Sequence, residues 1–402
     1  MKITDFKTIV VGNPPPRFGG RYFLFVKLET DNGLVGYGEI YGATFSAATM
    51  AQMAEDTAGR YLIGHDPFHI EKLWRRVYGS GYTLRPDVSL LGVLSGLEMA
   101  CWDIIGKACD KPVYELLGGQ VHERLRTYTY LYPKDGDAYA NTADDDHVYV
   151  NPDTAAQRAL EYLAQGFTAV KFDPAGPYTV YDGGMPTLEE LDRSERYVKT
   201  LRAAVGDKAD LLFGTHGQFT AAGAIRLARR LEPYDPLWFE EPVAPDSPAA
   251  MAQVAQQTSI PIATGERLCT KYEFARVLEH QAASILQPNL GRAGGLLEAK
   301  KIASIAEAFG AQIAPHLYCG PLVGAANIQL ATCSPNFLIL ESIEQLGGFH
   351  AELLETPVRW EDGYVIPSAE PGLGVTLNEA VAESHPYTGD ELHLQMGQDP
   401  LR

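Results

Sequence analysis

Asp210-Leu211-Leu212-Phe213-Gly214-Thr215-His216 is the first of five short runs between residues 210 and 341 that each end in a histidine or an acidic residue. The other four runs end at Glu240, Glu266, His316 and Glu341. In a barrel of parallel strands, side chains at the carboxyl ends of successive strands converge on one mouth. The five runs therefore predict one active site built from residues spread over 125 positions of chain (341 − 216 = 125).

Short apolar runs alternate with amphipathic helical segments from Thr127 onward. The runs cover 127–131, 168–173, 210–216, 236–241, 261–266, 282–287, 311–316 and 336–341. Between two of them, Ala224, Leu227, Ala228 and Leu231 form one apolar stripe at helical spacing. Strands that alternate with helices indicate repeated βα units and a parallel sheet. We therefore expect an α/β fold, a (β/α)8 TIM-type barrel over residues 121–359.

The first 120 residues have a different texture. Residues 1–10, 21–30 and 34–40 alternate like strands, and Asp31-Asn32-Gly33 supplies a tight turn between the last two. Helical patterns follow, and they end near Gly119. The sequence predicts a separate α+β domain over residues 1–120, which the C-terminal tail, about residues 360–402, returns to complete.

Composition limits the classes of function. The chain has 402 residues, 46% of them apolar, and we expect no window apolar for long enough to span a bilayer. The first residues lack the features of a signal peptide, and the five cysteines have no paired spacing. These features predict a cytoplasmic protein with reduced thiols.

The formal net charge of −18 opposes nonspecific binding to nucleic acid or to an anionic membrane. An anionic substrate would need a local positive centre. Glutamates clustered at strand ends are the oxygen ligands that Mg²⁺ prefers, so the expected cofactor is Mg²⁺, held weakly.

Several short motifs in this order resemble the enolase superfamily, in its mandelate racemase-like branch. Ala100-Cys101-Trp102-Asp103 with Gly106-Lys107, and later Leu116-Leu117-Gly118-Gly119, are similar to the first domain of that family. Phe239-Glu240-Glu241-Pro242, Gly265-Glu266-Arg267, Ile285-Leu286-Gln287-Pro288 and Ala314-Pro315-His316 are similar to its strand ends. Val170-Lys171-Phe172-Asp173-Pro174 and Gly176-Pro177-Tyr178 look most like the gluconate and galactonate dehydratases.

The resemblance implies a (β/α)8 barrel with an N-terminal α+β capping domain, and an assembly between a dimer and an octamer. It implies a Mg²⁺-dependent hydro-lyase that removes the α-proton of an aldonate and eliminates the 3-hydroxyl, giving a 2-keto-3-deoxy acid. An acid-sugar epimerase or cycloisomerase is the first alternative. The second is a metal-poor, catalytically silent relative that binds an acid sugar.

The implied metal ligands are carboxylates on the third, fourth and fifth strands, at positions 214, 240 and 266. Glu240 and Glu266 are present, but the first position is Gly214, which has no side chain to ligate a metal. Either His216, on the same inward face, replaces the missing ligand, or two glutamates hold the metal with water and substrate. We favour the second.

The resemblance also implies the catalytic groups. His316 would take the α-proton and His216 would protonate the departing hydroxyl, roles that suit a side chain with a pKa near neutrality. Asn289 stands where relatives carry an aspartate that supports His316. Glu341 would bind the substrate carboxylate, and burial could keep it protonated so that it donates a hydrogen bond.

Substrate contacts are expected from Lys171, Asp173, Tyr178, Arg17 and Arg21. By the resemblance, Lys171 stands where racemising relatives carry the first lysine of a Lys-x-Lys motif, and Asp173 replaces the second lysine. The absence of that second lysine weighs against racemisation. Asp173 is expected either to bind a sugar hydroxyl or to pair with Lys171. Tyr178 lies in a long connection, 174–189, on the predicted catalytic face, and the two arginines flank a Pro-rich loop of the first domain.

Overall fold

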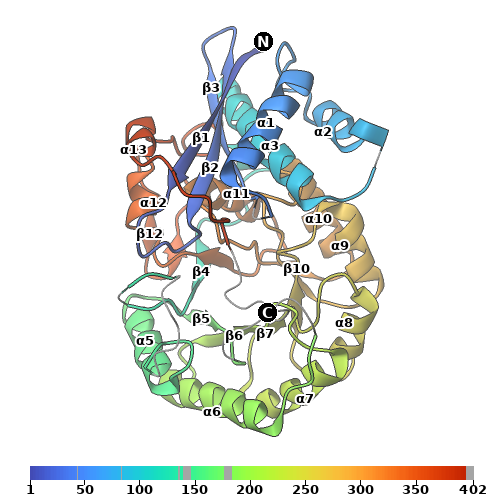
Figure 1. The fold of residues 1–402 in the computed structure, drawn as a ribbon, viewed down its shortest axis with the longest axis vertical. Helices are drawn as coiled ribbons and strands as arrows, with labels where there is room; N and C mark the ends of the chain where they lie inside the picture. The colour runs from blue at the N-terminus through green and yellow to red at the C-terminus, as the bar shows by residue number, and fades with distance from the viewer. Residues whose placement is uncertain (43, 83, 135, 139–145, 176–182, 395–402) are drawn as a thin grey trace.

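An antiparallel sheet and three helices form the first domain. The computed structural model describes residues 1–402 except 43, 83, 135, 139–145, 176–182 and 395–402. Strands β1 (Ile3–Gly12), β2 (Tyr22–Thr30) and β3 (Val35–Ile40) pair in that order, which confirms the predicted meander. Helices α1 (Ala47–Tyr61), α2 (Ile70–Tyr78) and α3 (Val88–Cys109) pack beside this sheet, at the top of Figure 1.

Helix α3 corrects one expectation from the sequence. It is long and apolar enough to cross a membrane by length and composition, with a mean hydropathy of 1.6 over its most apolar window. However, 89% of that window is buried inside the protein. The helix is apolar because it is the core of the first domain, where it packs against β3 and β2.

Eight parallel strands form the barrel, as predicted. They are β4 (Leu125–Tyr130), β5 (Ala169–Phe172), β6 (Asp210–Gly214), β7 (Trp238–Glu240), β8 (Ile262–Thr264), β9 (Ile285–Leu286), β10 (Gln312–Ile313) and β11 (Leu340–Ser342). Neighbouring strands pair from β4 to β10, and β11 pairs with β4. The ring closes where Ile313 pairs with Phe337, just before β11.

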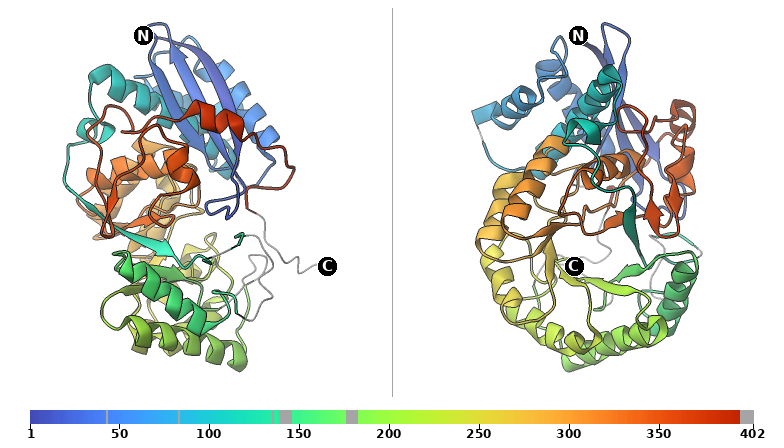
Figure 2. Two further views of the ribbon diagram at one scale, coloured as in Figure 1. Left: turned by 90° about the vertical axis from the view of Figure 1, so that its left-hand side faces the viewer. Right: turned by 180° about the vertical axis from the view of Figure 1, so that it is seen from behind.

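Helices follow the strands and surround the barrel, as the ring in the lower half of Figure 1 shows. They are α5 (Pro152–Ala164), α6 (Leu188–Val205), α7 (Ala221–Leu231), α8 (Pro248–Ala255), α9 (Thr270–Glu279), α10 (Leu296–Ala308), α11 (Pro321–Thr332) and the short α12 (Phe349–Glu352). Smaller elements are α4 (Val113–Leu116) and the 3-10 turns Ser80–Tyr82 and Glu232–Tyr234. Figure 2 shows the first domain seated on one side of this ring.

The C-terminal segment serves both parts of the molecule. Strands β12 (Trp360–Glu361) and β13 (Tyr364–Val365) form a hairpin that extends the barrel sheet at β4. Farther along, α13 (Glu379–Ser384) packs on β1, and Pro386 bridges to Val11. The chain thus crosses back to the first domain after it has left the barrel.

A layer of side chains fills the barrel interior. It takes one residue from each strand or its immediate flank: Tyr128, Ala169, Leu212, Trp238, Ala263, Ile285, Ala314 and Ile339. Because side chains alternate between the two faces of a strand, the residues two positions later also point inward. Those residues lie one step closer to the mouth, where the candidate site is found.

Two buried glutamates join the domains. Glu39, at the end of β3, accepts hydrogen bonds from the backbone N–H groups of Gly320 and Val323, which begin α11. Glu98, on α3, accepts from the N–H groups of Leu296 and Leu297, which begin α10. A carboxylate is stabilised at a helix N-terminus because unpaired N–H groups and the helix dipole both favour negative charge there. These contacts fix the first domain over two barrel helices.

Glu98 gives the domain interface a pH dependence that can be measured. Burial raises the pKa of Glu98 to about 7, although three donors oppose the shift. A raised carboxyl pKa means that the folded protein holds the proton more tightly than the unfolded chain does. The contribution to stability is therefore complete below about pH 4.5 and is lost as the pH rises to about 7.

We expect Glu98→Gln to reduce the fall in unfolding free energy between pH 5 and pH 8, by at most about 1.4 kcal/mol per pH unit. Urea unfolding at pH 5 and at pH 8 measures the free energy of unfolding of both proteins. The same fall in that free energy in Glu98→Gln and in the natural sequence would contradict the expectation.

Candidate active site

The second and third inward layers together carry most of the predicted site residues. Two positions beyond the apolar layer lie Tyr130, Lys171, Gly214, Glu240, Gly265, Gln287, His316 and Glu341. Two positions farther along three of these strands lie Asp173, His216 and Asn289. Glu266 joins the group, because its Oε2 lies 3.1 Å from His316 Nε2. Gly265 has a φ of 140°, and a Cβ there would press on Phe274 and the backbone of Gln287.

Lys171 is the positive centre of this layer. Its Nζ lies 2.6 Å from Glu240 Oε1 and 3.5 Å from Glu341 Oε1, and all three side chains are buried. Burial by itself lowers the pKa of Lys171, but the two glutamates outweigh it and raise the pKa above its usual value. Lys171 is therefore charged at neutral pH. The alternative that Asp173 pairs with Lys171 was wrong, because the glutamates take the ammonium.

The residues at the three expected metal positions do not fit a carboxylate-bound Mg²⁺. Both oxygens of Glu240 already have partners, Lys171 on one side and Gln287 Nε2 at 2.7 Å on the other. Position 214 supplies no ligand, and a Cβ built there would lie 3.5 Å from Lys171 Cε. Within the described residues, no three His, Cys, Asp or Glu side chains converge closely enough to hold a metal ion. The lysine ammonium thus lies beside the position of the missing ligand.

His316 lies between an amide and two carboxylates. Its Nδ1 is 2.9 Å from Asn289 Nδ2, and its Nε2 is 3.1 Å from Glu266 Oε2 and 3.8 Å from Glu341 Oε2. Burial lowers the pKa of His316 to about 4, and the charge of Glu266 only partly opposes this shift. The ring is therefore neutral near pH 7 and carries a single proton.

Glu341 is positioned to bind a carboxylate. Its Oε2 accepts a hydrogen bond of 2.8 Å from the backbone N–H of Leu317. Burial raises the pKa of Glu341, and this outweighs the opposing effects of Lys171 and of that N–H group. A raised pKa agrees with the expectation that burial favours the protonated form of Glu341, which can donate a hydrogen bond to a substrate oxygen.

His216 lies with Asp173 in a second acid–base pair, just beyond the carboxyl ends of strands β6 and β5. Its Nδ1 is 3.8 Å from Asp173 Oδ2, beyond hydrogen-bond length, so the contact is electrostatic. Burial lowers the pKa of His216, but Asp173 and Glu266 outweigh it and the pKa lies above its usual value. The alternative that His216 replaces the missing metal ligand is not favoured, because its ring is placed against Asp173.

The first domain closes over the site through Tyr41. The Tyr41 ring is stacked on His316 with centroids 6.5 Å apart, and the Arg292 guanidinium lies 3.5 Å above the same ring. His393, from the C-terminal segment, contacts Tyr41 edge-on at 5.0 Å. Three distant parts of the chain thus cover one side of the mouth.

The remaining predicted contacts lie farther out or outside the described residues. Arg17 forms an ion pair with Asp137, in the segment after β4. Arg21 pairs with Glu391 and donates to the carbonyl of Leu392 in the C-terminal segment. Tyr178 lies outside the described residues. All three stay predictions as substrate contacts.

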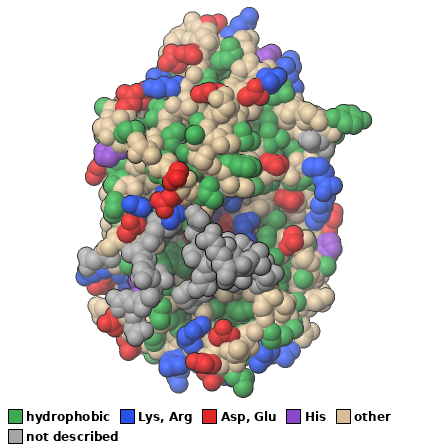
Figure 3. Space-filling view, viewed as in Figure 1, with side chains coloured by type: hydrophobic (Ala, Val, Ile, Leu, Met, Phe, Trp, Pro, Cys, Tyr) green, Lys and Arg blue, Asp and Glu red, His purple; other side chains and the backbone are tan. Residues whose placement is uncertain are grey.

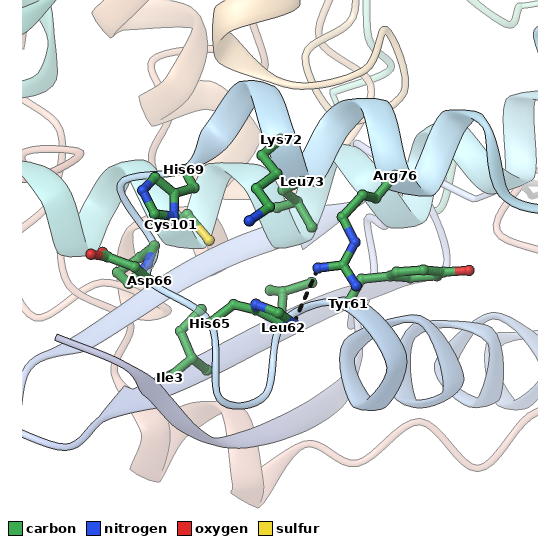
Figure 4. A pocket seen from close by; sticks show the side chains of 11 residues that line it. Ile3, Tyr61, Leu62, His65, Asp66, His69, Lys72, Leu73, Arg76 and Cys101 are labelled. Atoms are coloured by element: carbon green, nitrogen blue, oxygen red, sulfur yellow. Dashed lines mark hydrogen bonds between the residues drawn. The ribbon is translucent and has the colours of Figure 1, made fainter.

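Two surface features lie outside this site. Figure 3 shows Lys and Arg side chains interspersed with Asp and Glu over the viewed face, without one large basic patch. A hollow in the first domain lies near the start of β1, and His65, Asp66, His69 and Lys72 are among its lining residues (Figure 4). In it, His65 Nε2 and Arg76 NH1 are 3.2 Å apart. All of the residues that line it belong to the first domain, and none is a site residue, so the hollow is not part of the candidate site.

Sequence reasoning missed two members of the site. Gln287 was quoted only as part of a motif, although its even spacing from Asn289 already put it on the inward face. Tyr41 has no local sequence pattern that would indicate that its ring reaches His316. Arg267 and Glu241, which belong to two of the quoted motifs, form an ion pair with each other at 2.6 Å.

Comparison with known proteins was made at the level of families, sequences and structures. Residues 18–118 match the N-terminal domain of mandelate racemase and muconate lactonizing enzymes, and residues 154–381 match the enolase C-terminal domain-like family. A D-galactonate dehydratase of Ralstonia nicotianae is 37% identical over 390 residues, which cover 95% of this chain and 93% of that enzyme. A D-gluconate/D-galactonate dehydratase of Picrophilus torridus is 35% identical over 368 residues, covering 92% and 89%.

Solved structures agree over the whole chain. A crystal structure from Labrenzia alexandrii, of a protein described as a mandelate racemase/muconate lactonizing enzyme, superposes with a TM-score of 0.95. It is 68% identical in sequence, and the match covers 100% of this chain and 99% of that one. A similar protein from Sulfitobacter gives a TM-score of 0.94 at 52% identity, over 100% and 99% of the two chains.

The missing ligand gives a prediction about metal affinity. We expect Gly214→Asp in a Lys171→Met background to bind Mn²⁺ at least about tenfold more tightly than the natural sequence, because it restores a third carboxylate and removes the competing ammonium. A side chain fits at position 214, since a Cβ there meets only ordinary contacts.

Titration calorimetry with Mn²⁺ measures the affinity. The matched control is Gly214→Asn in the same Lys171→Met background, which has the same size without the charge. Equal affinities for the natural sequence and the aspartate variant would show that Glu240 and Glu266 suffice, and the prediction would fail.

Proposed function

Because the chain belongs to the mandelate racemase and muconate lactonizing enzyme family of the enolase superfamily, we propose that it is a sugar acid dehydratase, a hydro-lyase acting on an aldonate. One observation carries the proposal. Two histidines, His216 on the third barrel strand and His316 on the seventh, face a mouth that holds a buried ammonium and several carboxyl groups.

The first task of the site is to bind the substrate carboxylate. Lys171 is the charged donor of the inward layer, and Glu341, when protonated, donates from β11, two strands away. Removal of an α-proton places a second negative charge beside the carboxylate, which is the main barrier to the reaction. A fixed positive charge in a buried site stabilises that charge as it develops. Lys171 supplies this charge, and the Mg²⁺ expected from the sequence has no fitting donor set, so no step depends on it.

The second task is to move protons. A histidine takes the α-proton, and the electron pair of the C–H bond passes into the carboxylate to form an enediolate. The pair returns to form the C2–C3 double bond as the C3–O bond breaks, and the leaving hydroxyl receives a proton and departs as water. The resulting enol becomes a 2-keto-3-deoxy acid. Overall one water is lost and nothing is oxidised or reduced.

The relatives suggest which substrates to test first. Enzymes named for D-galactonate and D-gluconate are 35–37% identical over nearly the whole chain. We propose an aldonate of this size class as the substrate. An epimerase remains the alternative, and it would exchange the α-hydrogen with solvent without forming a keto acid.

The dehydratase proposal is tested by incubation with a panel of aldonates that includes D-galactonate and D-gluconate, with NMR detection of keto acid. We expect turnover of at least one aldonate. His216→Asn and His316→Asn should each lower kcat/KM at least about a hundredfold, because each removes a group that acts on the reacting atoms.

His65→Asn is the control, since this histidine lies in the hollow of the first domain, and its activity should equal that of the natural sequence. No keto acid from any aldonate of the panel would refute the proposal for this substrate class. Exchange of the α-hydrogen alone would favour the epimerase.

Lys171 should be needed for the chemical step. We expect Lys171→Met, which keeps the length of the side chain and removes its charge, to lower kcat at least about a hundredfold. Steady-state kinetics with the aldonate identified above measures the effect. Retention of kcat in Lys171→Met, with only KM raised, would mean that the ammonium binds the substrate but does not stabilise the transition state.

A further inference from the structure

The orientation of the Asn289 amide is fixed by its own neighbours. Its Oδ1 accepts a hydrogen bond of 2.8 Å from the backbone N–H of Gly291. The amide cannot be turned over, because a turned amide would set two donors against each other at that N–H. Its Nδ2 therefore faces His316 Nδ1 at 2.9 Å and Cys319 Sγ at 3.4 Å.

This orientation decides where the proton of His316 sits. An amide N–H₂ only donates, so Nδ1 of His316 must accept and carries no proton. A neutral imidazole has one proton, which must then be on Nε2. Nε2 faces the carboxylate of Glu266 at 3.1 Å, a neighbour that also favours a proton there. At Nε2, His316 is thus a hydrogen-bond donor without a free lone pair.

The expected role of His316 as base conflicts with this arrangement. An aspartate at position 289 would accept from Nδ1–H and leave Nε2 free to take a proton. Asn289 has the opposite effect. To act as base at Nε2, the ring would need a proton on Nδ1, which would point at the Asn289 amide protons.

The supporting carboxylate is found instead beside the other histidine. Asp173 Oδ1 is anchored by the backbone N–H of Ala175 at 2.9 Å, and its Oδ2 lies 3.8 Å from Nδ1 of His216. A carboxylate on this side favours a proton on Nδ1 and stabilises the imidazolium once Nε2 accepts another. His216 therefore has the environment of a general base, with Asp173 as its positioning residue.

From these contacts we infer that His216, positioned by Asp173, is the base that removes the α-proton, and that His316 is a neutral hydrogen-bond donor held in this state by Asn289. The inference rests on the proposed dehydratase function and deepens it. A neutral imidazole can stabilise a developing oxyanion by donation alone, without giving its proton away.

The assignment also determines the stereochemical course. His216 Nε2 takes the proton from C2 and becomes an imidazolium, which can release that proton again. It returns the same proton to the 3-hydroxyl as the C3–O bond breaks, and water leaves. One residue on one face serves both steps, so the elimination is syn. His216 acts from its neutral form and returns to that form when water leaves, and His316 keeps its proton throughout.

The first test reads the tautomer of His316 and does not depend on turnover. In protein labelled with ¹⁵N-histidine, long-range ¹H–¹⁵N spectra distinguish Nε2–H from Nδ1–H, and comparison with His316→Gln assigns the signals. We expect Nε2–H in the natural sequence and a change to Nδ1–H in Asn289→Asp. A proton on Nδ1 in the natural sequence would overturn the inference, whatever the activity.

The second test separates proton abstraction from elimination. The probe is the 3-deoxy analogue of the aldonate that the enzyme dehydrates, which can exchange its α-hydrogen in ²H₂O but cannot lose water. We expect His316→Gln, which keeps an N–H donor, to exchange within about tenfold of the natural rate, and His216→Asn to lose exchange at least about a hundredfold.

The reverse pattern, exchange lost in His316→Gln and retained in His216→Asn, would restore His316 as base and overturn the inference. Failure of the proposed function is a different result, because the natural sequence would then form no keto acid from any aldonate. The NMR test of the tautomer still decides the state of His316 in that case.

Discussion

Closure of the barrel is the constraint on which the rest of the structure depends. Once β11 pairs with β4 and Phe337 pairs with Ile313, every second side chain of each strand must point into an interior without solvent. The deeper layer is apolar apart from the Tyr128 hydroxyl and the Trp238 N–H. The next layer contains Lys171, Glu240, Gln287, His316 and Glu341, and buried groups of this kind are tolerated only when they find partners. The chemistry of the site follows from how those partners are arranged.

The charges in this layer balance around a lysine. Glu240 would be a costly buried carboxylate by itself, but Lys171 and Gln287 satisfy both of its oxygens. A glycine at position 214 leaves room beside the lysine side chain, and a third carboxylate is absent there. Glu240, which the family resemblance links to a metal, thus binds an ammonium ion of the protein itself. The first domain adds Tyr41 above His316, and Glu39 and Glu98 hold that domain in place on α11 and α10.

The two histidines differ because their neighbours differ. His316 accepts a hydrogen bond from an amide whose orientation is set by Gly291, whereas His216 lies against the carboxylate of Asp173. A neighbour that donates and a neighbour that accepts place the ring proton on opposite nitrogens. Asn289, in place of an aspartate, therefore changes the function of the His316 ring, although His316 itself is retained.

The sequence by itself determined the architecture. Eight apolar runs, the alternation of the first three strands and the residues at the strand ends predicted the domains' fold and brought together eight members of the site, including Lys171, His216 and Glu341. These features are local, because a strand's period of two and a helix's period of 3.6 can be read from neighbouring residues. The tertiary structure alone decided that Lys171 pairs with Glu240 and not with Asp173. It alone showed that Gln287 donates to the second oxygen of Glu240, that Tyr41 covers His316, and that the N–H of Gly291 fixes the orientation of the Asn289 amide. Each of these depends on distances between side chains from different strands, and such distances exist only after the ring has closed.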